Sequence, residues 1–281
     1  MALNLDSVGR SGPPGEHSWT ASDVVLYALG VGAGQDDAAG ELQFTTENSD
    51  GVALQVLPSF ANMLGFGGGM GMVGDFDLSA VLHGEQAFEV HRPLPAAGTA
   101  RTVSTVAGIY DKGKAAVVVL ESVSTDAASG ELLATVRNAT FIRGAGGFGG
   151  ERGLATEWTA PARPPDFSRS ATIPADQALL YRLTGDRNPL HSDPVFARKA
   201  GFDRPILHGM CTYGYTARIL LHEACGGRVE RFRAMSGRFA SPVYPGDTIT
   251  VEGWADGPQV LFRTLAGDSI VIDHGVLRRS A

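Results

Sequence analysis

The segment TGDRNPLHSD, residues 184–193, places three side chains that can handle protons and water within six positions. They are the carboxyl of Asp186, the amide of Asn188 and the imidazole of His191. A glycine precedes them and a proline interrupts them, so neither a regular helix nor an alternating strand is expected here. A purely structural turn would also use Asp186 and Asn188 as caps of backbone N–H groups, with His191 packed in the core. This window alone leaves both interpretations open.

The following segment, RPILHGMCTYGYTARILL (204–221), predicts a helix that starts at Gly209 and runs to about Ala224. A helix N-terminus exposes unpaired N–H donors and the positive end of the helix dipole. Glycine at that point allows a substrate oxygen to approach the backbone closely. Acid–base groups beside such a terminus are the parts needed to add or remove water next to a thioester carbonyl. The second segment therefore favours chemistry over a simple turn.

Composition limits the other classes of function. The chain has 281 residues, of which 43% are hydrophobic and 19% charged, with a formal net charge of −7. This acidic balance argues against extensive nucleic-acid binding. The two cysteines, Cys211 and Cys225, lie outside any CxxC pattern, which argues against a disulfide framework and structural zinc, and we expect no metal and no cofactor. The N-terminus has no apolar signal region and no run approaches the roughly 18–20 apolar residues of a membrane span, so we expect a cytoplasmic protein without a membrane partner.

Two matches to GxGxxG do not predict a dinucleotide site. The first, Gly69-Gly71-Gly74, has no strand before it. The second, Gly144-Gly146-Gly149, follows a strand but runs into a proline-bearing stretch instead of a helix. Both segments are better interpreted as loop and linker.

Periodicity and turn residues divide the chain into two similar halves. The first is predicted to have a helix over 20–29 and strands over 84–94, 99–111, 114–126 and 131–143. The second is predicted to have helices over 174–183 and 209–224, then strands over 231–243, 247–255, 259–266 and 269–278. Short connections imply antiparallel meanders. The halves echo each other in YALGVG (27–32) and YRLTGD (181–186), but the stretch after Tyr27 lacks the asparagine and the histidine, so the chemistry is expected in the second half.

The run from Tyr181 to Arg218 closely resembles the (R)-specific enoyl-CoA hydratases, also called type 2 or MaoC-like hydratases. Their motif, a tyrosine followed after a short gap by Gly-Asp-x-Asn-Pro-Leu-His, is matched throughout. LYALGVGAG (26–34), LHGEQ (82–86), HRPLPAAG (91–98) and FASPVYPGDT (239–248) extend the similarity to the two-repeat form. That form occurs as the hydratase part of peroxisomal multifunctional enzymes and as free-standing bacterial enzymes. The resemblance covers nearly the whole chain.

The resemblance implies an α+β double hot-dog fold, in which each repeat is a central helix wrapped by a curved antiparallel sheet. Residues 1–150 would form a non-catalytic N-terminal repeat that accommodates the acyl chain. Residues 151–281 would form the C-terminal repeat with the hydratase motif. The implied reaction is the reversible hydration of trans-2-enoyl-CoA to (3R)-3-hydroxyacyl-CoA. We expect a homodimer that needs no cofactor.

Residue roles follow from the same resemblance. Asp186 and His191 would hold and activate the water, Asn188 would orient it, and the Gly209 N–H would stabilise the thioester oxygen. His208 would shape the oxyanion site or only pack. The remaining substrate contacts implied here are Pro189 and Leu190 of the motif and, for the CoA phosphates, Arg238 first and Arg187, with Arg204, Arg218 and Arg233 as further candidates. The glycine- and methionine-rich segment 63–76 is a wall or lid for the acyl chain, or a loop without ligand contact.

Three alternatives keep parts of this interpretation. The same residues serve a (3R)-hydroxyacyl thioester dehydratase of fatty-acid or polyketide synthesis, because a catalyst works in both directions. A non-catalytic acyl-CoA-binding hot-dog subunit would not need the intact acid–base set. A hot-dog thioesterase would release free CoA. The type of acyl chain stays open among straight, branched and sterol side chains.

Overall fold

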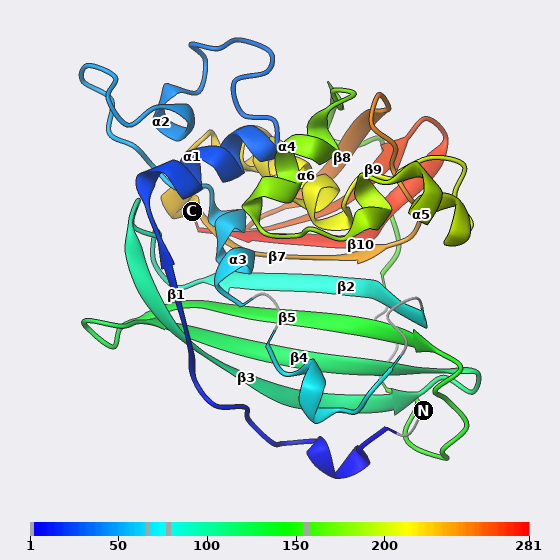
Figure 1. Cartoon of the computed structure of the whole chain (residues 1–281). Helices are drawn as coiled ribbons and strands as arrows, with labels where there is room; N and C mark the ends of the chain where they lie inside the picture. Colours follow the sequence, from blue (N-terminus) through cyan, green and yellow to red (C-terminus); the bar gives the residue numbers. More distant parts are fainter. Residues whose placement is uncertain (1–2, 66–67, 77–79, 154–157, 281) are drawn as a thin grey trace.

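The computed structural model describes residues 3–65, 68–76, 80–153 and 158–280. Its strands form one ten-stranded antiparallel sheet in the order β1-β3-β4-β5-β2-β7-β10-β9-β8-β6 (Figure 1). The order places residues 15–143 in one half of the sheet and residues 167–279 in the other, and the two halves meet where β2 pairs with β7. The strands are β1 (Gly15–Trp19), β2 (Val81–Val90), β3 (Gly98–Asp111), β4 (Ala115–Asp126), β5 (Leu132–Arg143), β6 (Phe167–Thr172), β7 (Phe232–Phe239), β8 (Thr248–Asp256), β9 (Gln259–Ala266) and β10 (Ser269–Arg279).

Helices gather on one side of this sheet, most of them over the C-terminal half (Figure 1). The α-helices are α1 (Ala21–Gly30), α2 (Leu42–Thr45), α3 (Ala61–Leu64), α4 (Gln177–Tyr181), α5 (Pro194–Lys199) and α6 (Gly209–Cys225). The short 3-10 turns are η1 (Leu5–Ser7), η2 (Pro58–Phe60), η3 (Met70–Met72), η5 (Arg182–Thr184), η6 (Pro189–His191) and η7 (Val229–Arg231).

The central helix of the C-terminal half is α6. Its residues from Cys211 to Leu221 are all buried, because the curved sheet surrounds it on several sides. The hydroxyl of Tyr213 donates to the backbone carbonyl of Met235 at 2.9 Å and also contacts that of Gln86 at 3.2 Å. The helix is thereby fixed to both strands at the seam of the sheet. It ends at Gly226, whose φ of +65° is the left-handed cap that glycine adopts at low cost.

Among the described residues, the corresponding position in the N-terminal half holds η2 and the four-residue α3. Phe60 and Leu64 of this segment are buried in the main core. A second, smaller cluster lies on the N-terminal half of the sheet and includes Val73 and Leu120. The two halves therefore share a sheet architecture but not a central helix of equal length.

The expected elements are found with few differences. The helix predicted over 20–29 is α1, the one over 209–224 is α6, and all eight predicted strands are present. The helix predicted over 174–183 begins later, at Gln177, and continues as η5. The edge strands β1 and β6 and the short helix α5 were not predicted, since their sequences lack a clear apolar period.

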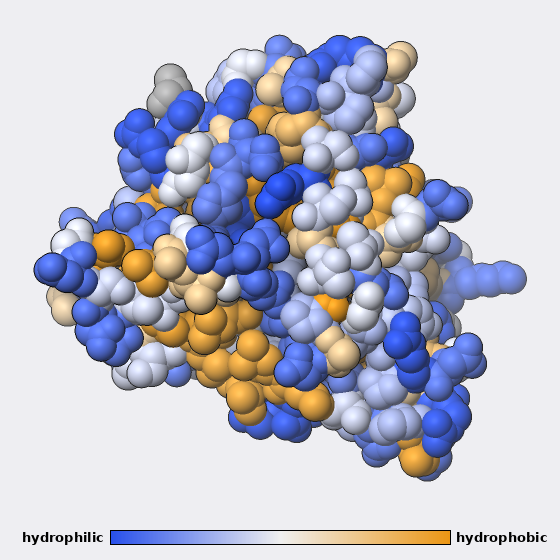
Figure 2. All heavy atoms as spheres, turned by 90° about the horizontal axis from the view of Figure 1, so that it is seen from above, coloured by the Kyte–Doolittle hydropathy of each residue, from blue (hydrophilic) through white to orange (hydrophobic). Residues whose placement is uncertain are grey.

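The helical side of the molecule is mostly hydrophilic, with hydrophobic side chains in separate groups (Figure 2). Exposed apolar residues on its helices are Leu29, Leu179, Leu183, Val195 and Phe196. Among the described residues, no helix is long and apolar enough to cross a membrane.

Candidate active site

The chain from Gly185 to His191 forms a tight loop that its own side chains hold in shape. Gly185 has a φ of +138°, a conformation that disfavours side chains. Asp186 accepts the Asn188 N–H at 3.0 Å through Oδ1, and Asn188 accepts the Leu190 N–H at 3.0 Å, which caps η6. The turn-forming interpretation of these two residues is thus confirmed. It does not exclude chemistry, because the same loop presents Asp186 and His191 to one another.

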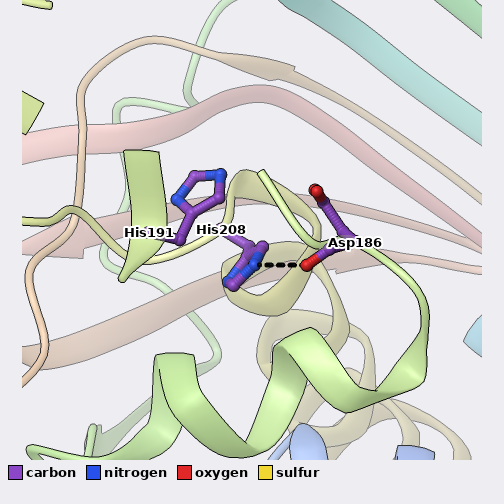
Figure 3. Close-up of side chains that lie close together, drawn as sticks. All are labelled: Asp186, His191 and His208. Carbon is purple, nitrogen blue, oxygen red and sulfur yellow. Dashed lines mark hydrogen bonds between the residues drawn. The ribbon is translucent and has the colours of Figure 1, made fainter. Parts of the chain in front are cut away.

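The side chains of Asp186, His191 and His208 lie close together (Figure 3). One carboxylate oxygen and one nitrogen of each ring lie within 4.8 Å of one another. Asp186 is half-buried, His191 is 8% exposed and His208 is 1% exposed. A carboxylate and an imidazole at this separation can share one water molecule between them.

The backbone sets which nitrogen of His191 is available. Nδ1 lies 2.9 Å from the carbonyl oxygen of Ile206, which can only accept, so Nδ1 carries the hydrogen. Nε2 of the neutral ring is then a bare acceptor. Burial lowers the pKa of His191, although the Ile206 carbonyl and the Asp186 charge oppose this shift. The ring is therefore neutral at neutral pH and ready to take a proton.

His208 contacts both Asp186 and His191. Its Nε2–H donates to the backbone carbonyl of Asp186 at 3.2 Å, and its ring stacks on His191 with centroids 3.8 Å apart. Burial first, and then the neighbouring His191, lower the pKa of His208 to about 4. His208 is therefore neutral at neutral pH and places no positive charge against the His191 ring.

The N-terminus of α6 lies next to this cluster, since His208 directly precedes Gly209. The first hydrogen bond of α6 runs from the Cys211 N–H to the carbonyl of His208 at 3.0 Å. The N–H groups of Gly209 and Met210 come before it and therefore have no acceptor within the helix. Gly209 is exposed. A Cβ at Gly209 would lie 3.3 Å from the Phe239 ring, so glycine also keeps this approach open.

A groove of about 430 Å³ lies on the N-terminal half of the sheet. Its lining includes Met63, Gly65, Gly68, Gly69, Gly71 and Met72 of the predicted wall segment, together with Thr102 and Ser104 of β3. Phe66 and Gly67 of that segment lie outside the described residues. A Cβ built on Gly185 would lie 3.9 Å from the methyl carbon of Met63. One end of the groove lining therefore lies next to the loop of residues 185–191.

The three converging side chains are also the donor types that bind transition metals. Their geometry suits that role less well. The imidazole planes of His191 and His208 stack with an angle of 29° between them, so the lone pairs of the two rings lie side by side. A metal ion needs both to aim at a single point, which would require one ring to turn. The arrangement fits proton transfer more closely.

The predicted CoA-binding arginines have different surroundings. Arg187 is exposed on the catalytic loop. Arg238 is exposed on β7, opposite Glu85 and Asp273, and alternation puts it on the other face of the sheet from Phe239. Arg218 is not available for a ligand, because it is buried in an ion pair with Glu41 at 2.8 Å.

The remaining candidates have these places. Pro189 is exposed at the start of η6 and Leu190 is partly buried within it. Arg204 contacts Asp247 at 3.8 Å, and Arg233 lies at the opposite end of β7 from Phe239.

Sequence reasoning did not single out His83 and Gln86 of β2. The ring of His83 lies 4.7 Å from that of Phe239, and its Nε2 is 2.9 Å from Oε1 of Gln86. The signal that could have found them is Gly84 within a strand, since an internal glycine often marks a bulge.

The other sequence interpretations concern glycines and cysteines. Gly147 and Gly149 donate to the carboxylate of Asp111 at 2.9 and 2.8 Å, so the second GxGxxG segment is held as a loop. The first lies at η3 along the groove. Cys211 and Cys225 of α6 are buried, free cysteines.

Comparisons with known proteins agree with this geometry. Residues 17–144 match the MFE-2 hydratase 2 N-terminal domain and residues 157–273 match the MaoC like domain. The chain is 45% identical to 3-hydroxyacyl-thioester dehydratase Y of Mycobacterium tuberculosis, over 99% of this chain and 98% of that protein. It is 43% identical to enoyl-CoA hydratase ChsH3 of the same organism, over 98% of each.

The fold is also that of a solved relative. A MaoC-like dehydratase from Phytophthora capsici superposes with a TM-score of 0.88 at 30% identity, over 99% of this chain and 98% of that one. The expected hot-dog class is confirmed by this match and by the two family domains.

Proposed function

The chain belongs to the MaoC-like enoyl-CoA hydratase 2 family, and from this premise we propose that it hydrates trans-2-enoyl-CoA reversibly to (3R)-3-hydroxyacyl-CoA. It is a hydro-lyase acting on acyl thioesters in lipid metabolism. The observation that supports this most directly is the convergence of Asp186 and His191 beside the N-terminus of α6. We further propose a cytoplasmic homodimer whose two repeats divide near residue 150.

In the proposed mechanism, one water lies between the Asp186 carboxylate and Nε2 of His191. His191 takes a proton from this water while the oxygen attacks C3 of the enoyl group. The electron pair of the double bond moves toward the thioester oxygen, where the N–H of Gly209 stabilises the enolate. The imidazolium then returns a proton to C2, so the elements of one water have been added and the enzyme is restored.

Asp186 has a supporting role in this scheme. Its negative charge favours the protonated form of His191, and so stabilises the imidazolium of the intermediate. Its carboxylate also orients the water, while Asn188 holds the loop that carries both groups. Neither Asp186 nor His191 forms a covalent bond with the substrate.

The groove on the N-terminal half is the proposed site of the acyl chain. Met63 connects its lining to the candidate catalytic loop, and space is open beside Gly71, where no atom lies within 4 Å of a Cβ built on that residue. For the CoA phosphates we propose Arg187 before Arg238, because Arg187 lies on the same loop as the catalytic groups.

The test is the hydration of crotonyl-CoA. The reaction is monitored through the loss of the enoyl absorbance, and the configuration of the product is determined by chiral analysis. Asp186→Asn and His191→Ala should each fold and lose about 10²–10⁴-fold in turnover, the usual scale for acid–base groups. Asp176→Asn, at the N-cap of α4, is the matched control and should keep activity. Near-normal turnover by either site variant would reject the assignment, and free CoA released at a comparable rate would indicate a thioesterase instead.

The dehydratase alternative uses the same groups in reverse. The similarity to 3-hydroxyacyl-thioester dehydratase Y favours retaining it. The two directions differ in the preferred thioester carrier, so the same enoyl group offered on CoA and on an acyl carrier protein separates them by kcat/KM.

A further inference from the structure

The central strand β2 carries a β-bulge that redirects a histidine toward the active site. In the pairing with β5, His83 faces Thr140 and Glu85 faces Ala139, so Gly84 is an extra residue. The inserted residue shifts the alternation and brings the side chains of His83 and Gln86 to the same face. A Cβ at Gly84 would lie 3.1 Å from the carbonyl oxygen of Ala139, which explains the glycine.

A chain of hydrogen bonds sets the proton position on His83. The backbone carbonyl of Ser59 can only accept, so the Asn62 atom 2.8 Å away from it is the amide nitrogen Nδ2, which donates a hydrogen bond. Oδ1 of Asn62 then accepts a hydrogen bond from Nε2 of Gln86 at 2.6 Å. This leaves Oε1 of Gln86 to accept from Nε2 of His83 at 2.9 Å. Each amide orientation follows from the one before it, so the hydrogen of neutral His83 is on Nε2 and Nδ1 is the acceptor.

The middle of this chain is well protected. Asn62 and Gln86 are each 4% exposed, so water competes little for their hydrogen bonds. His83 at the end of the chain is exposed. Desolvation lowers the pKa of His83, while hydrogen bonding to Gln86 and to the backbone of Glu85 and the charge of Asp186 oppose this shift, so the ring is neutral at neutral pH.

His83 also lies on the wall of the proposed active site. Its ring packs against Phe239 with centroids 4.7 Å apart. The Phe239 ring in turn faces Gly209, where a Cβ would be 3.3 Å away. Phe239 thus lies between Gly209 and His83, so His83 is one side chain away from the place where the proposed mechanism holds the thioester.

We propose that His83, contributed by the N-terminal repeat, is a substrate-binding residue whose Nδ1 accepts the first amide N–H of the pantetheine arm. This inference rests on the proposed function. The enoyl group has no donor, and the first donor beyond the sulfur is that amide, two methylene groups away. Asn62 and Gln86 are positioning residues that keep the acceptor nitrogen turned toward it.

Two model substrates test this contact. Crotonyl-N-acetylcysteamine carries the amide, and the crotonyl 2-acetoxyethyl thioester replaces its N–H with an ester oxygen. The wild-type enzyme should prefer the amide by about three- to tenfold in kcat/KM, mainly through KM, as expected for one hydrogen bond. His83→Phe should reduce this ratio to about one.

The matched control is His91→Phe. His91 follows β2 at its other end and bonds to the hydroxyl of Thr135 at 3.0 Å, so the ratio should stay at the wild-type value. Equal kcat/KM of the wild-type enzyme for the two thioesters, or an unchanged ratio in folded His83→Phe, would overturn the inference while the hydratase assignment stands. No hydration of crotonyl-CoA by the wild-type enzyme would instead overturn the proposed function, and this inference with it.

Discussion

The two repeats have similar segments around Tyr27 and Tyr181, but the chain that follows each tyrosine forms a different structure. Tyr27 and Tyr181 are both buried, and their rings meet at 6.4 Å between centroids. After Tyr181 the chain makes the loop of Asp186 and His191. After Tyr27 it instead reaches Glu41, whose carboxylate binds Arg218 and His222 of α6 at 2.8 and 2.7 Å. The segment that follows the tyrosine is thus a candidate catalytic loop in one half and leads to an ionic anchor in the other.

The central helices differ in a related way. The C-terminal half fills its sheet with the 17 residues of α6, whereas the N-terminal half has the four-residue α3 and a groove of about 430 Å³. A long helix in both halves would leave little room for an acyl chain. Under the proposed function, the shorter helix of the N-terminal half creates space for the acyl chain next to the candidate catalytic loop of the other half.

The largest expected effect concerns the ionic anchor. Burial alone would raise the pKa of Glu41, but His222, Arg218 and the N–H of Gly34 together lower it, so the carboxylate is charged and paired. Arg218→Met removes one partner of a buried pair and should lower the free energy of unfolding by about 3–5 kcal/mol. Urea denaturation measures this change.

The exposed pair Arg169–Asp36 provides the control for that experiment. It spans 3.4 Å between residues that are both largely exposed, so Arg169→Met should change stability by less than about 1 kcal/mol. Equal losses in the two variants would show that the buried pair is not a special anchor and would weaken the contrast between the repeats.

Much of this organisation could be predicted from the sequence, for reasons that differ between elements. The alternation in β8 and the apolar run of α6 predicted their type directly. The motif from Gly185 to His191 points to chemistry in the C-terminal half, which stays a prediction. The edge strands β1 and β6 have mostly exposed side chains, so no apolar period marked them.

The site could be predicted only in part. Asp186, His191 and Gly209 come from neighbouring segments and were predicted together. His83 comes from the other repeat and reaches the site through a bulge, which depends on strand pairing and not on local propensity. Arg218 was a candidate for CoA binding because its charge was visible, whereas its burial against Glu41 depends on contacts 177 residues apart.

A second prediction concerns acid stability, which should depend on the catalytic half. The pKa of His208 is lowered to about 4, whereas an unfolded histidine titrates near about 6.5. Between these values the unfolded chain binds a proton that the folded chain does not, so stability is full above this window and falls as the pH drops through it. One such group contributes a slope of at most about 1.4 kcal/mol per pH unit.

His208→Phe should therefore flatten the dependence of unfolding free energy on pH between about 4 and about 6.5. His191 contributes in the same direction, so some slope should remain. His17→Phe, at an exposed residue of β1 in the other repeat, is the control and should leave the slope unchanged. An identical slope in His208→Phe and the wild-type protein would show that the buried histidine does not set acid sensitivity.

The smallest expected effect addresses the groove. Gly71 lines it, its φ is not positive, and no atom lies within 4 Å of a Cβ built there. Gly71→Leu should therefore fold without strain and narrow the groove, lowering kcat/KM for decenoyl-CoA by about tenfold, the scale of a misfit of a few methylene groups. Crotonyl-CoA, whose chain is too short to extend along the groove, is the internal control and should be hydrated at the wild-type rate. Met72→Ala removes a flexible side chain from the same lining and should therefore widen the groove. We expect it to raise kcat/KM for enoyl-CoA substrates with branched chains. If Gly71→Leu slowed both substrates equally, the acyl chain would have to lie elsewhere, and the shortened helix of the N-terminal repeat would need another explanation.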